Sequence, residues 1–352
     1  MNNNFLIVIK SIRFPLIIGV ILIHSVIIKS DEAINMGYSI LGYSTKLMCE
    51  ILPQFCVPMF FAISGYLFFY NLDKFSTRQY LNKIKRRFHT LFIPYLFWNL
   101  VVAICYIISN QLFGRFEDLT KYSLIEWFDV FYSKFGGFPI AYQLWYLRDL
   151  IVLCIFAPLI YLTIRYGKYY SIILLFLVMI SQIEFPKIVP IFYFSLGALF
   201  SIHNLEVERY AKRCFKYALL TSLISLSLLI FYIRNPVTSL LNVIYSISMF
   251  ILIIYLASSL IKKNYIHRIG ANLSKYSFFI YCYHGFPIVV ICTIILQSSN
   301  IIFGEDCSIF KDLTLTLSIP IVVTLIILGG IYIYKILSRF FPNFTAFING
   351  KR

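Results

Sequence analysis

The stretch Arg13-Phe-Pro-Leu-Ile-Ile-Gly-Val-Ile-Leu-Ile-His24 opens the first long apolar segment of the chain and holds two ionisable residues. Eleven steps of about 100° return an α-helix to nearly the same direction, so Arg13 and His24 would share one face, roughly 16 Å apart along the axis. That separation is about half the hydrocarbon thickness of a bilayer. Because lipid rejects both side chains, we expect this face to point into a polar interior.

Each of the two residues also has a purely structural interpretation. An arginine at the end of a membrane helix often extends its guanidinium to the lipid headgroups. A lone histidine in a helix is often a packing residue with one hydrogen-bonded nitrogen. The shared face and the depth of His24 favour a functional pair over two independent structural residues.

Composition excludes a soluble protein. Of the 352 residues 60% are hydrophobic and only 13% are charged, and the mean hydropathy is +0.82. A soluble domain cannot bury so much apolar surface. We therefore predict an all-α, polytopic membrane helix bundle that forms a single membrane-embedded domain over residues 1–352. The aromatic content of 18% is typical of interfacial belts.

The hydrophobic pattern predicts about ten transmembrane helices. We expect them over residues 12–30, 51–70, 91–110, 144–164, 170–183, 186–202, 214–233, 237–260, 275–297 and 313–337. Merging the short fifth and sixth spans would invert every later loop and destroy the charge asymmetry described next.

The distribution of positive charge predicts the orientation. With the N-terminus in the cytoplasm, 21 of the 31 Lys and Arg residues fall in inside segments and 8 in outside loops, and Arg13 and Arg148 lie within spans. This asymmetry follows the positive-inside rule, so we expect cytoplasmic termini, a cytoplasmic 71–90 loop and an outside 111–143 loop. The net charge of +16 then reflects membrane topology and lipid partners, and no nucleic acid is expected.

Cysteine and histidine spacing does not indicate a metal site. The chain has no CxxC motif and no paired Cys/His pattern, so no metal is predicted. Most of the eight cysteines lie in apolar segments and resemble small hydrophobic residues. Cys49 and Cys307 fall in loops expected outside, where a disulfide between them is an open alternative.

His24 is the best candidate for a general base. Its unperturbed pKa lies near neutrality, so it can take a proton from a hydroxyl and return it. The absence of GxSxG and HExxH motifs argues against a serine hydrolase and a zinc protease. His284 in a later span is either a packing residue or a cavity wall opposite His24. The carboxylates that remain as partners for His24 are Asp149 and Glu184.

Two further segments have both a structural and a binding interpretation. Ser64-Gly65 is a small patch that permits close helix approach, and Ser64 could also donate a hydrogen bond to a ligand. Arg86 and Arg87 precede the third span at the inner mouth. They either determine topology and contact anionic lipids, or form a basic cradle for a phosphorylated cytosolic cofactor.

The fourth span begins with aromatic and charged residues at the expected outer face. Trp145 fits an aromatic belt and would also stack on a sugar ring. Arg148 could hold a phosphate or a sugar there. Adjacent helical residues point about 100° apart, so Arg148 and Asp149 are not expected to pair with each other.

Taken together, the chain resembles acyltransferase family 3, the integral membrane acyltransferases. The family hallmark, an Arg and a His separated by ten residues in the first span, stands here as Arg13 and His24. Other segments that resemble the family in order are Val57-Pro-Met-Phe-Phe-Ala-Ile-Ser-Gly-Tyr66, Arg86-Arg87 leading to Ile93-Pro94-Tyr95, Leu144-Trp145-Tyr146-Leu147, Tyr193-Phe194-Ser195-Leu196-Gly197, and Ile280-Tyr281 with His284.

The resemblance implies transfer of an acyl group, usually acetyl from acetyl-CoA, onto a hydroxyl of a cell-envelope glycan or another acceptor. Some family members carry an SGNH-type outer domain, and this chain is expected to be a stand-alone member without one. We expect a multi-pass protein of a bacterial-type cytoplasmic membrane. An exporter or flippase of a glycan or its lipid-linked precursor is the alternative, against which the lack of an inverted repeat weighs.

In this scheme the cofactor site lies at the inner mouth and the acceptor site further along the bundle. Arg13, Arg86 and Arg87 would bind the phosphates of CoA, and Ser64 would contact the pantetheine arm or the oxyanion. His24 would act as the base or as a covalent acyl carrier. Trp145, Arg148 and His284 are the candidate acceptor-binding residues.

Overall fold

The computed structural model describes residues 3–72, 75–114, 118–134, 136–181, 187–231, 236–261, 269–270, 272–304 and 308–351. These residues form helices, and no strand occurs among their elements, which confirms the all-α prediction. The elements are α1 (Asn3–His24), α2 (Ser30–Asn35), α3 (Ser39–Thr45), η1 (Lys46–Ile51), α4 (Cys56–Phe69), α5 (Thr77–Arg87), η2 (Phe88–Phe92), α6 (Ile93–Phe113), η3 (Leu119–Lys121), α7 (Leu124–Tyr132), η4 (Tyr142–Leu144), α8 (Trp145–Ile155), α9 (Ala157–Ile180), α10 (Ile188–Ile202), α11 (Val207–Phe231), α12 (Pro236–Ile261), η5 (Ser274–Tyr276), α14 (Ser277–Tyr283), α15 (Gly285–Phe303), α16 (Ile309–Phe340) and α17 (Pro342–Ile348).

Eight helical segments within the described residues are long and apolar enough to cross a membrane, so the chain is a multi-pass membrane protein. They are Phe5–His24, Ser39–Phe69, Thr77–Leu112, Ala157–Ile180, Val207–Ile230, Thr238–Leu260, Gly285–Phe303 and Ile309–Phe340. Ile188–Ile202 is a shorter apolar helix. The expected gap between the spans 144–164 and 170–183 is a kink inside α9, where Lys168 has φ 47° and ψ −127°.

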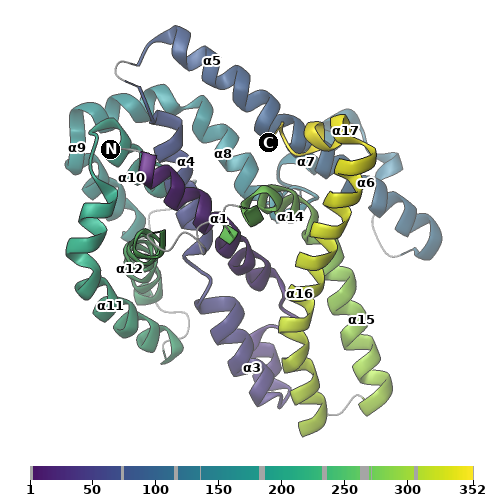
Figure 1. The fold of residues 1–352 in the computed structure, drawn as a ribbon. Coiled ribbons are helices and arrows are strands. Elements are labelled where there is room, and N and C mark those ends of the chain that lie inside the picture. The colour runs from purple at the N-terminus through teal and green to yellow at the C-terminus, as the bar shows by residue number, and fades with distance from the viewer. Residues whose placement is uncertain are drawn as a thin grey trace.

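Helix α1 runs through the middle of the molecule and packs against α4, α12, α14 and α16 (Figure 1). Its boundaries differ from the expected span 12–30, because apolar residues from Phe5 onward extend the helix toward the N-terminus. It ends at His24, where the Ser25 amide bonds back to the carbonyl of Leu22 in a tightened last turn. Arg13 therefore lies near the middle of α1, and His24 is its last residue.

Helices α4 and α10 cross at very close range, as the small patch at Ser64-Gly65 predicts. A Cβ atom added at Gly65 would lie 2.0 Å from the carbonyl oxygen of Phe194, and one added at Gly197 would lie 1.8 Å from that of Ala62. Only glycine permits the two backbones to approach this closely. The crossing fixes the position of Ser64 beside the site described below.

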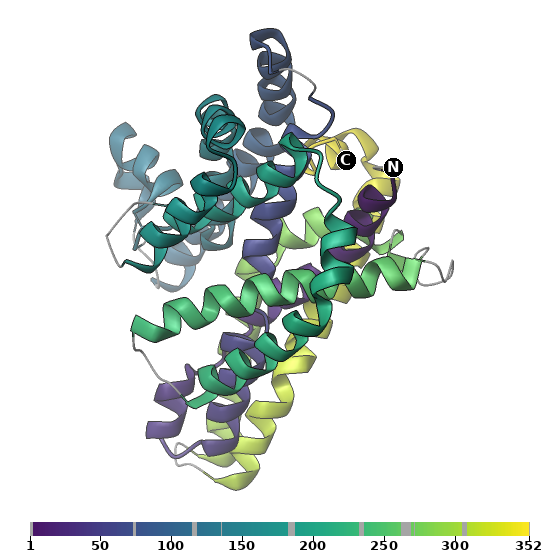
Figure 2. The same cartoon turned by 90° about the vertical axis from the view of Figure 1, so that its left-hand side faces the viewer.

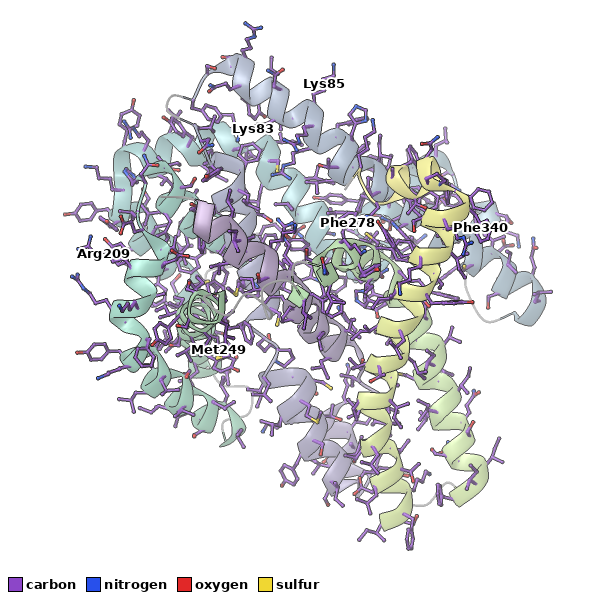
Figure 3. The ribbon with its side chains drawn as sticks, in the orientation of Figure 1. Lys83, Lys85, Arg209, Met249, Phe278 and Phe340 are labelled. Carbon is purple, nitrogen blue, oxygen red and sulfur yellow. The ribbon has the colours of Figure 1, made fainter. Side chains whose placement is uncertain are left out.

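The two chain ends and the basic helix α5 lie toward one end of the molecule, and α3 lies with the end of α15 and the start of α16 toward the other, as both views show (Figures 1 and 2). At this second end the carboxylate of Asp312 on α16 accepts hydrogen bonds from the amides of Ile40 and Leu41 at the start of α3. Lys85 on α5 and Arg209 on α11 point away from the bundle, whereas Phe278 on α14 lies near its centre (Figure 3).

The expected span 275–297 is divided at His284 into α14 and α15. Pro287 has no amide hydrogen to give to the carbonyl of Tyr283, and Gly285 follows the break directly. The His284 ring turns back on α14, where its Nδ1 lies 2.7 Å from the carbonyl oxygen of Tyr281. His284 was expected within this span, but inside one continuous helix, whereas the structure places it at the junction of two helices.

Candidate active site

One cavity of about 670 Å³ lies between α1, α4, α8 and α14. Seven α1 residues line it, and six of them recur every three or four positions and form one stripe along the helix: Leu6, Lys10, Arg13, Ile17, Val20 and His24, with Ile9 beside it. Arg13 and His24 therefore share a face and line one cavity, as their spacing indicates. The uninterrupted α1 keeps them about 16 Å apart along its axis.

The cavity is cationic at one end. Among the described residues, its lining includes four basic residues, Lys10, Arg13, Arg87 and Lys275, and no Asp or Glu. None of these four takes part in an ion pair among the described residues. Lys10 and Lys275 are exposed and Arg13 and Arg87 are half-buried, so positive charge leads from solvent into the cavity. Such an arrangement attracts a polyanion.

The two arginines predicted at the inner mouth differ in their environment. Arg87 lines the cavity, and its guanidinium carbon lies 5.9 Å from the centre of the Phe68 ring. Arg86 is exposed and does not line the cavity, because adjacent residues of α5 point in different directions. The structure therefore brings Arg87 together with Arg13 and leaves Arg86 at the surface.

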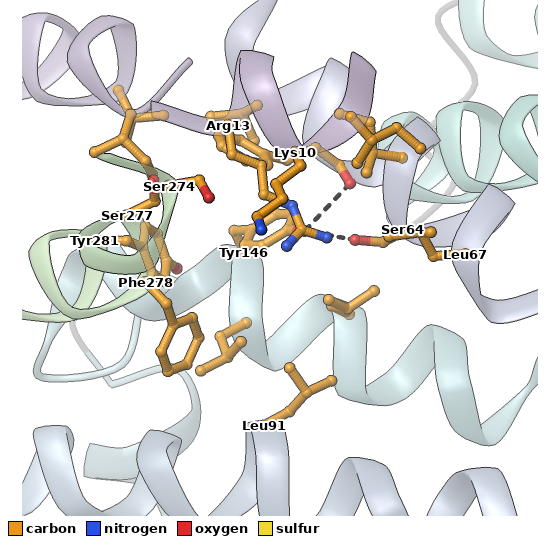
Figure 4. A pocket seen from close by; sticks show the side chains of 18 of the residues that line it. Lys10, Arg13, Ser64, Leu67, Leu91, Tyr146, Ser274, Ser277, Phe278 and Tyr281 are labelled. Carbon is orange, nitrogen blue, oxygen red and sulfur yellow. Dashed lines mark hydrogen bonds between the residues drawn. The ribbon is translucent and has the colours of Figure 1, made fainter. Parts of the chain in front are cut away.

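Ser64 lies on the α4 wall, opposite Arg13 (Figure 4). Its hydroxyl lies 2.9 Å from that of Tyr146 on α8, and the Tyr146 hydroxyl donates to the carbonyl of Phe60 over 3.3 Å. Because a carbonyl only accepts, Ser64 is the consistent donor to Tyr146. Lys10 and Arg13 project from α1 into the space between α8 and α14.

His24 occupies the other end of the stripe, beside two rings from distant segments. The centroid of its imidazole lies 5.1 Å from that of the Tyr142 ring and 5.3 Å from that of the His284 imidazole. His284 is fully buried, and its Nε2 has no hydrogen-bond partner among the described residues. Because Nδ1 faces a carbonyl that can only accept, a neutral His284 carries its proton on Nδ1 and presents Nε2 as an acceptor.

Gln143 lines the cavity with His24 although only 2% of it is exposed. Its Nε2 donates to the carbonyl of Cys282 over 2.9 Å, and the Tyr281 hydroxyl donates to the Gln143 backbone carbonyl over 2.8 Å. Its Oε1 has no partner among the described residues. Because buried acceptors are nearly always hydrogen-bonded, the unpaired Oε1 indicates that a ligand bound in the cavity supplies the donor.

The fourth-span residues divide into two groups. Trp145 lines the cavity. Arg148 does not: it is 5% exposed and bonds the carbonyls of Tyr132 and Gly137. The expectation that Arg148 and Asp149 do not pair is wrong, because Arg148 Nε donates to Asp149 Oδ1 over 2.9 Å. The long arginine side chain bends back over its own turn and so overcomes the angle between adjacent Cα–Cβ bonds.

No carboxylate among the cavity-lining residues is available to orient His24. Asp149 is engaged by Arg148 and by Lys187 Nζ at 2.9 Å, and Glu184 lies outside the described residues. Cys307 also lies outside them, so the alternative of a disulfide stays open, and Cys49 is a buried thiol. No group of three or more His, Cys, Asp or Glu side chains that could hold a metal occurs in the described part of the chain.

Sequence reasoning missed several residues of the cavity. Lys10 could have been found, because it stands three positions before Arg13 on the same helical stripe. Lys275, Gln143 and Tyr281 could not, since their proximity to α1 depends on the packing of η5 and α14 against α1 and of η4 against α14.

Comparison with known proteins shows the family of the chain. A family model described as an acyltransferase domain matches residues 7–335. The chain is 26% identical over 209 residues to the succinoglycan biosynthesis protein ExoH of Rhizobium meliloti (strain 1021), an alignment that covers 57% of this chain and 55% of that protein. The chain thus spans about half the length of this relative. No solved structure matches the chain. Because the family model covers nearly the whole sequence, the chain belongs to the acyltransferase family that this domain defines.

Proposed function

We propose that this protein transfers an acyl group, most simply acetyl, from acyl-CoA to a hydroxyl of a cell-envelope glycan or lipid-linked sugar. The observation that carries the proposal is the gradation along the α1 stripe. Cations stand at one end, Ile17 and Val20 in the middle, and His24 at the other end. Acyl-CoA has the same order of chemistry: phosphates, a thin uncharged arm and a reactive thioester.

The phosphates of the donor would bind Arg13 and Arg87 by charge-assisted hydrogen bonds, with Lys10 and Lys275 at the entrance. The pantetheine arm would pass the hydroxyl of Ser64 and reach the end of the cavity that His24 lines. An apolar passage suits an uncharged arm, because it excludes water from the thioester until the acceptor arrives.

His24 would then act in one of two ways. As a general base it takes the proton of the acceptor hydroxyl while the oxygen attacks the thioester carbonyl carbon, the C–S bond breaks, and the CoA thiolate takes the proton from the imidazolium. As a nucleophile it first forms an acyl-imidazole with release of CoA, and the acceptor oxygen then attacks that acyl group. In both routes one thioester and one hydroxyl give one ester and one thiol.

The acceptor class is supported by the relative and by an aromatic residue of the cavity. The name of ExoH connects that protein to the biosynthesis of succinoglycan, a polysaccharide. In this chain Trp145 lines the cavity and would stack on a sugar ring. His284 is fully buried and does not line the cavity, so it would act through the adjoining His24 ring and not by contact with the acceptor. Arg148 is not part of the proposed acceptor site, because its guanidinium is bonded to Asp149 and to backbone carbonyls.

The direct test uses the purified protein in lipid nanodiscs with acetyl-CoA and cell-envelope polysaccharide from the source strain. We expect CoA release that depends on the protein, together with new O-acetyl signals in the NMR spectrum of the polysaccharide. Binding or transport of the polysaccharide without cleavage of any acyl-CoA would contradict the proposal and favour an exporter.

A further inference from the structure

The side chain of Gln143 is held in one orientation. Its NH₂ group donates to the carbonyl of Cys282 on α14, and a carbonyl can bond only to the nitrogen end of an amide. The backbone carbonyl of Gln143 accepts the hydroxyl of Tyr281 from the same helix. The two bonds tie Gln143 to α14 and direct its other amide atom, Oε1, away from Cys282.

The structure makes specific room for this amide. A Cβ atom at Gly285 would lie 2.1 Å from Oε1 and 2.3 Å from Cδ of Gln143, closer than atoms can approach. Gly285 adjoins His284, whose ring lies beside that of His24. The lack of a side chain at residue 285 therefore leaves room for the Gln143 amide next to the residue that follows His284.

Oε1 is an acceptor without a donor. No hydrogen bond reaches it from the described residues, although Gln143 is 2% exposed and lines the cavity. Buried acceptors are almost always bonded, so the missing donor belongs to what enters the cavity. An oxyanion does not fit, because Oε1 repels it, whereas a hydroxyl fits.

We propose that Gln143 is a specificity-determining residue that accepts a hydrogen bond from a second hydroxyl of the acceptor, next to the hydroxyl that is acylated. The inference rests on the proposed function and adds the acceptor class: a vicinal diol, as in a pyranose ring. Amide N–H groups of the pantetheine arm are the other possible donors. Position favours the acceptor, because Gln143 stands at the His24 end, where the thioester and the attacking oxygen meet.

The test compares two small acceptors with acetyl-CoA as donor: trans-1,2-cyclohexanediol and cyclohexanol, which differ by one hydroxyl. A site built around a substrate hydroxyl rejects the analogue that lacks it, so we expect wild type to prefer the diol by about tenfold or more in kcat/KM. In Gln143→Met the ratio of kcat/KM for the diol to kcat/KM for cyclohexanol should fall toward one, while the KM for acetyl-CoA stays unchanged.

Gly285→Ala gives an independent check. The new methyl group should displace the Gln143 amide and reduce the diol preference while Gln143 itself is present. In a Gln143→Ala background the same change should have no further effect on the preference, since the displaced group is already gone.

Asn99→Leu is the matched control for a buried amide. Asn99 is fully buried, its Nδ2 donates to the carbonyl of Tyr95, its Oδ1 accepts from the Ala141 amide, and it does not line the cavity. We expect this variant to lower the melting temperature and to retain the diol preference.

The outcomes separate the two proposals. If wild type does not cleave acetyl-CoA, the proposed function fails. If it cleaves acetyl-CoA without preferring the diol, or if Gln143→Met keeps the preference, the inference about Gln143 is wrong. A raised KM for acetyl-CoA in Gln143→Met with an unchanged diol preference would assign Oε1 to the pantetheine amide and likewise overturn it.

Discussion

The imidazole rings of His24 and His284 lie 5.3 Å apart between centroids, at an interplanar angle of 35°. They come from opposite parts of the chain, one from the last residue of α1 and the other from the junction of α14 and α15. The helix of that span breaks at His284, and the His284 ring meets the His24 ring at this break. His24 thus lines the end of the cavity opposite its cations, and the buried His284 packs against it.

Arg13 is predicted to bind the donor. Arg13→Ala should raise the KM for acetyl-CoA about 10–100-fold, since a hydrogen bond to a charged group contributes about 1.5–3 kcal/mol. Arg13→Lys should recover part of the affinity, because lysine keeps the charge and lacks the planar fork. Arg86→Ala, at an exposed residue outside the cavity, is the control and should leave this KM unchanged. A change in acceptor KM alone would show that the donor binds elsewhere.

The Gly65 crossing is predicted to be essential for packing. Gly65→Ala would place Cβ 2.0 Å from the carbonyl oxygen of Phe194, so α4 and α10 must separate, at a cost of about 1–3 kcal/mol. We expect a clear loss of melting temperature in detergent. Gly329→Ala in α16 is the matched control, because its nearest neighbour, the Tyr283 hydroxyl, would lie 3.5 Å away. Equal melting temperatures for the two variants would refute the close crossing.

Asp149 is predicted to be structural. Its removal leaves the buried Arg148 guanidinium without its counter-charge, and breaking such a pair costs about 3–5 kcal/mol. Asp149→Ala should therefore lower the melting temperature strongly, whereas Lys187→Ala should have a small effect, since 38% of that side chain is exposed. If Arg148→Ala is stable and raises only the acceptor KM, Arg148 binds the acceptor after all.

The orientation in the membrane can be tested by cysteine labelling. In a cysteine-free background, a membrane-impermeant maleimide should label Lys134→Cys from outside intact cells and Lys85→Cys only after the membrane is opened. The reason is the excess of Lys and Arg in the segments assigned to the cytoplasm. Labelling of residue 134 only from the cytosol would invert the topology.

Much of the architecture follows from local sequence. Composition identified a helical membrane protein, and the helical repeat placed Arg13 and His24 on one stripe, because both depend on neighbouring residues alone. The boundaries of α1 were less accurate, since the expected span began after Lys10, whereas Lys10 lies within the helix and lines the cavity.

The remaining part of the site depends on tertiary contacts. The pairing of Arg148 with Asp149 required the bent arginine side chain, and the presence of Gln143 in the same cavity as His24 required the packing of η4 against α14. Neither of these two contacts can be predicted from the pattern of neighbouring residues. Gly285 and Pro287 did offer a signal for the break at His284, since glycine followed by proline weakens a helix.

The most direct measurement is acetyl transfer by His24→Gln, with His24→Ala, CoA binding and melting temperature measured in parallel. A catalytic base or nucleophile supplies about 10²–10⁴-fold, so both variants should lose activity by that factor, mainly in kcat, while they still fold and bind CoA. Glutamine keeps a hydrogen-bonding side chain but neither accepts the proton nor carries the acyl group. Substantial turnover in His24→Gln, with reduced stability in His24→Ala, would show that His24 is a packing residue and contradict the account.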